Sequence, residues 1–343
     1  MTTTLHAQTA VAPTSMRGTL ARCVPLLALA ALAAAPMLLS PYLTDLVQKI
    51  AIFAVFALSL ELLVGTTGLV SLGHAAFFGI GAYITALATP QDGPGAIFSL
   101  LPLAMLGAGA YALFVGALSL RTKGVYFIMV TLAFAQMAYF VFHDTHVGGG
   151  SDGMFLTARP ALSIAGTTLI DLELPRHRYY LALAALAATY ALLALLQRSR
   201  FGHALAGIRA NEQRMRAAGF NTYAYKLAAF MLAAMLAGAA GFLMAAKDGA
   251  VNPELLSWHE SGAVLLMIIL GGLGSLRGAV LGAAAFILLK EGLSSDSLVG
   301  PLALRWQLTL GLTMIALVAF MPNGLIGLHA QWLQRRKETP HGK

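Results

Sequence analysis

The stretch AYKLAAFMLAAMLAGAAGFLMAA, residues 224–246, decides the fold class, because Lys226 is its only charged side chain. A helix needs about 20 mostly apolar residues to cross the hydrocarbon core of a membrane. Similar runs recur along the chain, and we predict an all-α integral membrane protein. Its membrane-spanning helices, about ten in number, are expected at roughly residues 20–40, 44–64, 69–89, 97–120, 124–142, 179–197, 224–246, 259–276, 278–293 and 305–326.

The composition supports this fold class and excludes others. Hydrophobic residues make up 58% of the 343 residues and charged residues only 10%, whereas an ordinary globular domain carries about 25% charged residues. A water-soluble surface cannot be built from so few charges. The formal net charge of +8 lies in short clusters between apolar runs, which favours contact with a cytoplasmic lipid leaflet over nucleic acid. The single cysteine, Cys23, excludes an intrachain disulfide and a cysteine-cluster metal site.

Basic residues also predict the topology, since Lys and Arg collect on the cytoplasmic side of membrane proteins. Most basic clusters fall on one side if both termini are cytoplasmic. This arrangement predicts a tail at 1–16, a transmembrane domain at 17–328 with an outer loop at 143–178 and a cytoplasmic segment at 198–221, and a basic tail at 329–343. Lys49, Lys290 and Arg305 are isolated exceptions on the outer side, and the outer loop also holds Arg159, Arg176 and Arg178. The region around Arg277 is either two spans or one kinked helix.

Glycine-rich segments in the apolar runs have two interpretations. Small residues let helices pack closely in lipid, but broken helices that line a path are also glycine-rich. Candidate path or helix-break residues are Ser71, Gly73, His74, Gly271, Gly272 and Gly274. His74 is either functional or a donor to a carbonyl of a neighbouring helix. For Glu61 and Gln136 we favour polar pairing with a neighbouring helix.

The segment from Gln197 to Asn221 is basic and has apolar residues at helical spacing, with Gly219 at a plausible helix end. We predict a short amphipathic helix beneath the membrane. It is either an interfacial anchor on anionic lipid or a docking surface for a cytoplasmic partner.

Enzyme motifs are missing from the sequence. GGGSDG at 148–153 lacks the Lys-Ser/Thr ending of a phosphate loop, and GGLGSLRG at 271–278 has Arg277 in the third glycine position of G-x-G-x-x-G. We therefore predict no catalytic residue, no metal site and no cofactor bound by this chain. Active transport would need energy from a partner or an ion gradient.

Five strings together resemble the permease subunits of branched-chain amino acid ABC importers, specifically the LivM-like subunit. They are GLVSLGHAAFFGIGAY at 68–83, RTKGVYFIMVTLAFAQ at 121–136, GGGSDG, SRFGHALAGIRANE at 199–212 and LLMIILGGLGSLRGAVLGAA at 265–284. The match covers most of residues 44–323 in the family's order.

The resemblance implies an ABC-importer permease fold in a bacterial inner membrane. It also implies a second homologous permease, two cytoplasmic ATPase subunits that use ATP and Mg, and a periplasmic solute-binding protein. By the same resemblance, the coupling residues that meet the ATPase are Gly202, Leu205, Arg209, Asn211, Glu212, Ala218 and Gly219, and the candidate docking residues for the binding protein are Gly149, Ser151 and Asp152.

The expected function is import of branched-chain or other hydrophobic amino acids by alternating access. We expect Leu205, Ile208 and Met215 to face the permease body. The polar side chains Arg209, Asn211 and Glu212 are expected to face the ATPase. The alternatives are a permease for urea or short-chain amides, an ion-coupled secondary transporter, a passive channel and a membrane-bound enzyme.

Overall fold

The computed structural model describes residues 29–90, 93–164, 167–295, 300, 305–321 and 324–327. The chain divides into two compact units, residues 1–44 and 45–343. In the first unit, the described part holds a short apolar helix, Leu29–Leu38, and the beginning of α2. All elements from Asp45 onward belong to the second unit, which carries the features discussed below. The predicted tails at 1–16 and 329–343 lie outside the described residues.

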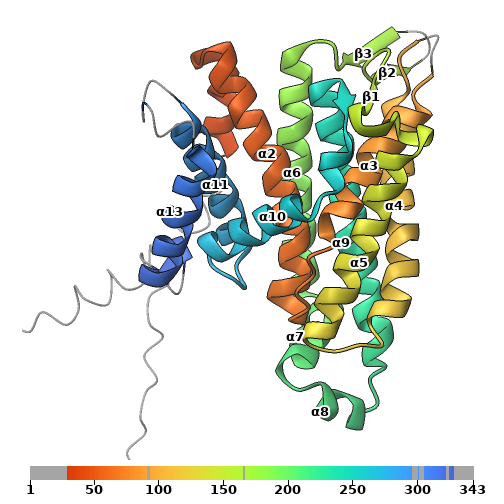
Figure 1. Cartoon of the computed structure of the whole chain (residues 1–343), viewed down its shortest axis with the longest axis vertical. Coiled ribbons are helices and arrows are strands. Elements are labelled where there is room, and N and C mark those ends of the chain that lie inside the picture. The colour runs from red at the N-terminus through yellow and green to blue at the C-terminus, as the bar shows by residue number, and fades with distance from the viewer. Residues whose placement is uncertain are drawn as a thin grey trace, which may run out of the picture. The chain divides into compact units, whose positions relative to one another are not determined.

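Helices dominate the described residues (Figure 1). The α-helices are α2 Pro41–Glu61, α3 His74–Ala88, α4 Ile97–Ser119, α5 Val125–Asp144, α6 Pro175–Arg198, α7 Arg200–Ala210, α8 Glu212–Ala217, α9 Thr222–Asp248, α10 Trp258–Gly271, α11 Leu276–Ser294 and α13 Trp306–Phe320. A π-helical segment, η1 (Leu62–Thr67), continues α2, and the 3₁₀ turns are η2 (His146–Gly148), η3 (Gly150–Asp152) and η4 (Pro253–Leu256).

Six helices among the described residues are long and apolar enough to cross a membrane, and the bent pair of α10 and α11 raises the number to seven if it forms one span. The helical membrane fold is confirmed, whereas the number of ten spans and the cytoplasmic termini stay predictions. Two predicted spans correspond to shorter helices in the structure. The span at 69–89 begins as a helix only at His74, and the span at 20–40 falls partly outside the described residues.

The outward faces of the helices fit a lipid environment. Leu106 and Phe114 of α4 and Met129 of α5 are each more than half exposed. Water would disfavour so many exposed apolar side chains, whereas lipid solvates them. The helices therefore present apolar side chains both to each other and to the membrane.

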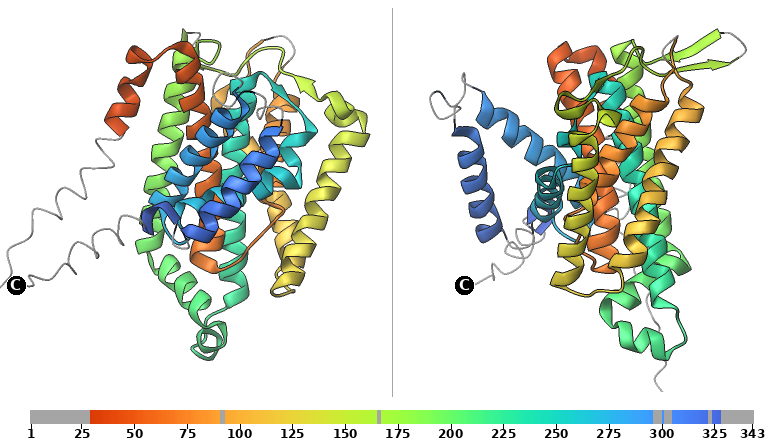
Figure 2. Two further views of the ribbon diagram at one scale, coloured as in Figure 1. Left: turned by 60° about the vertical axis from the view of Figure 1, so that its left-hand side comes forward. Right: turned by 45° about the vertical axis from the view of Figure 1, so that its right-hand side comes forward.

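The buried centre of the second unit is formed by α9 with α3 and α4 (Figures 1 and 2). A side chain on Gly81 of α3 would collide with the backbone of Gly238 of α9, and one on Gly241 of α9 with the carbonyl of Phe78. Phe77 and Phe230 meet edge to face at 5.4 Å beside this contact. For these glycines, close helix packing is the structural role, as small residues in membrane helices permit.

The outer loop contains short strands that the sequence analysis did not predict. β2 (Ala161–Ile164) pairs antiparallel with β3 (Thr167–Asp171), and β1 (Met154–Phe155) pairs antiparallel with β4 (Ala250–Val251). β4 follows α9, so the second pair ties the loop to a distant part of the sequence. Figure 1 shows the strands at one end of the second unit and α7 and α8 at the other.

Candidate functional site

A sharp turn separates α10 from α11. α10 ends at Gly271 and α11 begins at Leu276, and their axes differ by 117°. Gly272 and Gly274 have φ angles of 114° and 85°, which residues other than glycine rarely adopt. The side chain of Ser275 caps α11 by accepting a hydrogen bond from Gly278 N–H at 3.3 Å. We call residues 272–275 the α10–α11 turn, and it contains two of the predicted helix-break residues, with Gly271 directly before it.

A buried carboxylate holds this turn. Glu61 is the last residue of α2 and is fully buried, and its Oε1 accepts a hydrogen bond from Gly274 N–H at 2.7 Å. The side chain folds over Gly65 of η1, where an added Cβ would collide with Glu61 Oε1. The expected polar pairing of Glu61 is therefore made with the backbone of the α10–α11 turn.

The predicted coupling segment begins close to the end of α2. Ser199 caps α7 by accepting from Gly202 N–H at 3.2 Å, and a side chain on Gly202 would collide with the backbone at the end of α6. Leu205 and Ile208 are buried, as their helical spacing predicted, and α7 packs on η1. The close junction of α6 and α7 thus presses α7 against the end of α2.

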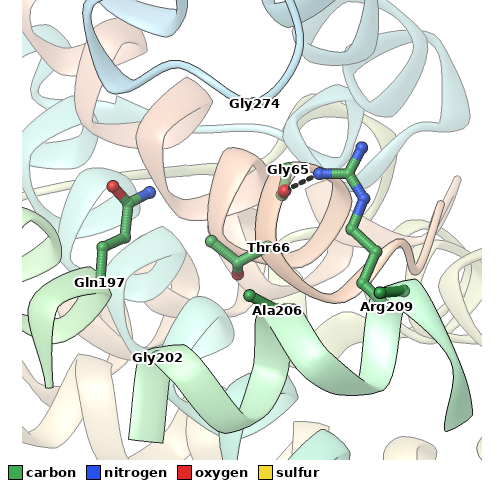
Figure 3. A pocket seen from close by; sticks show the side chains of 8 residues that line it. Gly65, Thr66, Gln197, Gly202, Ala206, Arg209 and Gly274 are labelled. Atoms are coloured by element: carbon green, nitrogen blue, oxygen red, sulfur yellow. Dashed lines mark hydrogen bonds between the residues drawn. The ribbon is translucent and has the colours of Figure 1, made fainter. Parts of the chain in front are cut away.

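Arg209 joins α7 to α2. Its guanidinium Nη1 donates a hydrogen bond to the carbonyl of Gly65, and its chain passes within 3.3 Å of the place where a Cβ on Gly68 would lie (Figure 3). The sequence analysis placed Arg209 on the face that meets the ATPase. The structure adds this contact with the end of η1, which offers a backbone carbonyl within reach of the side chain. Arg209 is also exposed, and its contact with an ATPase stays a prediction.

These contacts border an open cavity of about 480 Å³ between α7, η1 and the α10–α11 turn (Figure 3). Gln197, Gly202, Ala206 and Arg209 line it from one side, and Thr66 and Gly274 from the other. We call the set Glu61, Gly65, Arg209 and Gly274 the coupling junction. Sequence reasoning missed Gly65 and Gln197, since no local signal marks them.

The second half of the coupling segment is a separate helix, α8. The prediction of one short helix was wrong here, because Asn211 leaves the helical conformation and its side chain caps α8 by accepting from Arg214 N–H at 2.9 Å. α8 ends with Gly219 at φ 87°, and Phe220 N–H donates to the carbonyl of Met215 at 3.1 Å. This is a Schellman motif, which explains the glycine there.

Glu212 is partly buried and is paired with side chains of this chain. It pairs with Lys226 of α9 at 2.6 Å and with Arg216 at 2.5 Å, and accepts a hydrogen bond from Thr222 at 3.1 Å. Burial alone would raise the pKa of Glu212, but these partners, Lys226 first, outweigh burial and hold it below the usual value. Glu212 therefore fastens α8 to the start of α9, while Asn211 and Ala218 are exposed. The contact of these residues with an ATPase stays a prediction.

His74 opens α3 and is completely buried. Its Nε2 lies 2.8 Å from Ser59 Oγ of α2, and its ring stacks on Phe56 at 5.6 Å. The hydroxyl of Ser261 in α10 caps α3 by accepting from Ala75 N–H at 2.9 Å. The structure thus pairs His74 with a serine hydroxyl on the neighbouring helix instead of a carbonyl. Ser71 accepts from Gly73 N–H at 3.2 Å just before α3.

The predicted docking residues lie at the opposite end of the second unit. Gly149, Ser151 and Asp152 are exposed in and beside η3, and the Ser151 hydroxyl donates to Asp152 at 3.3 Å. Nearby, Phe155 and Val147 also expose most of their side chains. Among the described residues, no three histidine, cysteine or acidic side chains lie together as metal ligands would.

Comparison with known proteins decides the family. The family model of the branched-chain amino acid transport system permease component matches residues 42–319. The chain belongs to this permease family. The family and the apolar helices make the permease a multi-pass inner-membrane protein, as predicted.

Individual relatives support the same family. The permease is similar to the high-affinity branched-chain amino acid transport system permease protein LivM of Escherichia coli strain K12, with 29% identity over 345 residues that cover 93% of this chain and 78% of the relative. LivM of Salmonella typhimurium strain LT2 matches with the same identity and coverage. The xylose transport system permease protein XylH of Escherichia coli K12 matches 28% of the chain at 31% identity. No solved structure matches the permease.

Proposed function

We propose that the permease is the membrane subunit of an ATP-driven ABC importer that moves branched-chain and other hydrophobic amino acids by alternating access. The match to the family model over residues 42–319 and the names of the LivM relatives support this proposal. In the same proposal, the chain crosses the membrane about ten times, as its apolar runs suggest, and both termini are cytoplasmic.

The contacts within the coupling junction support this mechanism. α7 contacts η1 through Arg209 and Gly65, and the same end of α2 holds the α10–α11 turn through Glu61 and Gly274. A force on α7 would therefore reach α2 and both helices beside the turn through direct hydrogen bonds. Helices that move as rigid bodies about a glycine turn are a common way to expose a path alternately to each side.

The proposed partners are those that the resemblance to the importer permeases implies. Two cytoplasmic ATPase subunits would bind ATP and Mg and press on α7 and α8, and a second homologous permease would complete the path. A periplasmic binding protein would dock at the exposed residues Gly149, Ser151 and Asp152. Affinity for the amino acid can then reside mainly in the binding protein.

Uptake into proteoliposomes tests the proposal. The complex is copurified with its ATPases, its binding protein is added, and radiolabelled leucine is offered with and without ATP. Unlabelled valine and isoleucine should compete with leucine, and urea should not. Competition by urea alone would favour the amide importer, and leucine uptake driven by an ion gradient without ATP would favour a secondary transporter.

Labelling of single cysteines tests the topology. Cys23 is first replaced by Ala, and one cysteine is then placed at Asp152, Gln213 or His341. A membrane-impermeant maleimide should label position 152 from the periplasmic side, and positions 213 and 341 only after the membrane is opened. Labelling of 152 and 213 from the same side would overturn the proposed orientation.

A further inference from the structure

A second cavity lies at the interface of α2, α10, α11 and α13. It has a volume of about 430 Å³, within the range of about 300–1,000 Å³ that small-molecule sites occupy. The helices that form it include α2, α10 and α11, which meet α7 at the coupling junction. Figure 2 shows α11 and α13 side by side in both views, and the two helices are in contact.

The charged residues of this cavity come from distant parts of the sequence. Lys49 of α2 and Lys290 of α11 line it together with Glu254 and Glu260. The two lysines are two of the three isolated basic residues that did not follow the predicted cytoplasmic placement of positive charge. Lysine in a membrane helix is costly and usually marks a functional path or an ion pair.

The four charges are close, but they do not neutralise one another in tight pairs. Lys290, Lys49 and Glu254 all act electrostatically on Glu260. Within the described residues, the salt bridges join other side chains. The ammonium of Lys290 lies 5.4 Å from the ring centre of Trp306. Both signs of charge therefore remain available on the wall of the cavity.

The rest of the wall is mostly apolar, with Ser257, His259 and Gln307 as its other polar residues. Phe53 of α2 and Phe286 and Ile287 of α11 are buried and line the cavity, with Leu310 of α13 on the other side. A ligand that satisfies this wall must carry a cation, an anion and an aliphatic group within a few ångströms. A zwitterionic amino acid with a branched aliphatic side chain has this combination, whereas urea has neither the charges nor the aliphatic group.

We propose that this cavity is a transient binding site for the amino acid within the membrane. Lys290 and Lys49 hold the carboxylate, Glu260 and Glu254 hold the ammonium, and Phe53, Phe286 and Ile287 contact the aliphatic side chain. The inference rests on the proposed function, because it names the place where the transported amino acid is held.

The cavity is connected to the coupling junction by its helices. Glu260 lies in the first turn of α10, which leads to the α10–α11 turn, and Lys290 lies near the far end of α11, which starts there. Lys49 lies twelve residues before Glu61 on α2, a separation of about 18 Å along a helix. A change of the angle at the turn would move Glu260 and Lys290 relative to each other, and so open or close the site.

Tryptophan fluorescence tests the site without transport. Trp258 and Trp332 are replaced by Phe in the full chain, so that Trp306 is the only tryptophan, and the chain is placed in lipid nanodiscs. Leucine is titrated beside two analogues, leucinol, which lacks the carboxylate, and 4-methylpentanoate, which lacks the ammonium. Saturable changes in Trp306 emission are expected with leucine and weaker changes with either analogue.

Charge-neutralising variants assign the two halves of the site. Lys290→Gln should weaken the binding of leucine and 4-methylpentanoate about tenfold and leave the binding of leucinol unchanged, as expected for the loss of one charge-assisted contact. Glu260→Gln should weaken the binding of leucine and leucinol but not that of 4-methylpentanoate. Lys290→Arg should restore leucine binding. Arg305→Gln removes an exposed charge outside the cavity lining and is the matched control, with no change expected.

The outcomes separate the two proposals. A response of Trp306 that is absent, or that Lys290→Gln weakens equally for leucine and leucinol, overturns the site even if leucine uptake is normal. A response with the predicted analogue pattern in a protein whose complex does not import leucine supports the site and overturns the proposed function.

Discussion

The bundle of α3, α4 and α9 and the pair of α10 and α11 use similar glycine-rich interfaces, but they differ in what satisfies their backbone. The bundle helices run past one another without a sharp turn, so most amides and carbonyls of their interiors are satisfied within each helix. The exceptions include Pro102 of α4, which has no N–H, and Ala75 at the start of α3, which donates to Ser261. Between α10 and α11 the backbone is irregular, and Gly274 N–H needs the side chain of Glu61 as its partner. We infer that the bundle is the rigid scaffold and that the α10–α11 pair is the part whose geometry can change.

The largest effect is expected from a methyl group in the scaffold. The Cβ of Gly241→Ala would collide with the Phe78 carbonyl, which is backbone and cannot turn away. Overpacking of this kind costs about 1–3 kcal/mol, and we expect the upper end, with a large loss of protein recovered from gel filtration after heating. Gly262→Ala in α10 is the control, since nothing lies within 4 Å of its added Cβ. Equal thermal stability of the two variants would contradict the division into scaffold and moving part.

The second-largest effect is expected from a substitution of Glu61. Glu61→Ala removes the acceptor of Gly274 N–H and leaves a cavity under the turn, so we expect a loss of about 1–3 kcal/mol and about a tenfold fall in coupled uptake. Glu61→Gln keeps an acceptor oxygen and should recover most of both. Thermal melting and uptake are measured on the same preparations. Full uptake by Glu61→Ala would show that the turn does not depend on the carboxylate.

Arg209 should affect coupling more than stability. Arg209→Ala removes the bond to the Gly65 carbonyl, and we expect leucine uptake per ATP hydrolysed to fall about fivefold, equivalent to about 1 kcal/mol, with melting nearly unchanged. Arg200→Ala, on the same helix and exposed, is the matched control for lost charge. If both variants lower the ratio equally, the effect is one of charge at α7 and not of its contact with α2.

The smallest effect is expected at the outer loop. The backbone N–H and the guanidinium of Arg159 bond Glu173 and hold the pKa of this carboxyl below its usual value of 4.5, against a weaker effect of burial. The folded pKa is depressed, so the stabilisation is complete above the unfolded value and is lost as pH falls below about 4.5 towards the folded pKa. Because the carboxyl is half exposed, the loss should be under about 1 kcal/mol. Melting at pH 4 and pH 7 should differ less in Glu173→Gln than in the wild type.

Several features of the fold and of the junction were predictable from the sequence. Apolar runs located most helices, since length and hydropathy suffice where lipid is the solvent. Helical spacing identified Leu205 and Ile208 as the buried face of α7, and the glycines at 271–274 marked the turn. The division of the coupling segment at Asn211 was missed, although an Asn before Glu-Gln is a recognisable helix start. The strand pairs were missed because β1 and β4 are too short to show a pattern, and they meet only through the fold.

By itself, the sequence determined the membrane class, the family and the position of most helices, because each depends on local composition or on strings of neighbouring residues. Only the tertiary structure decided that Arg209 faces α2, that Glu61 holds Gly274, and that Lys49 and Lys290 share one cavity with Glu260. The physical reason is that nearly every side of these helices is apolar, so hydropathy does not reveal which face meets which. The partners of the few polar groups are set by the crossing of helices far apart in the chain.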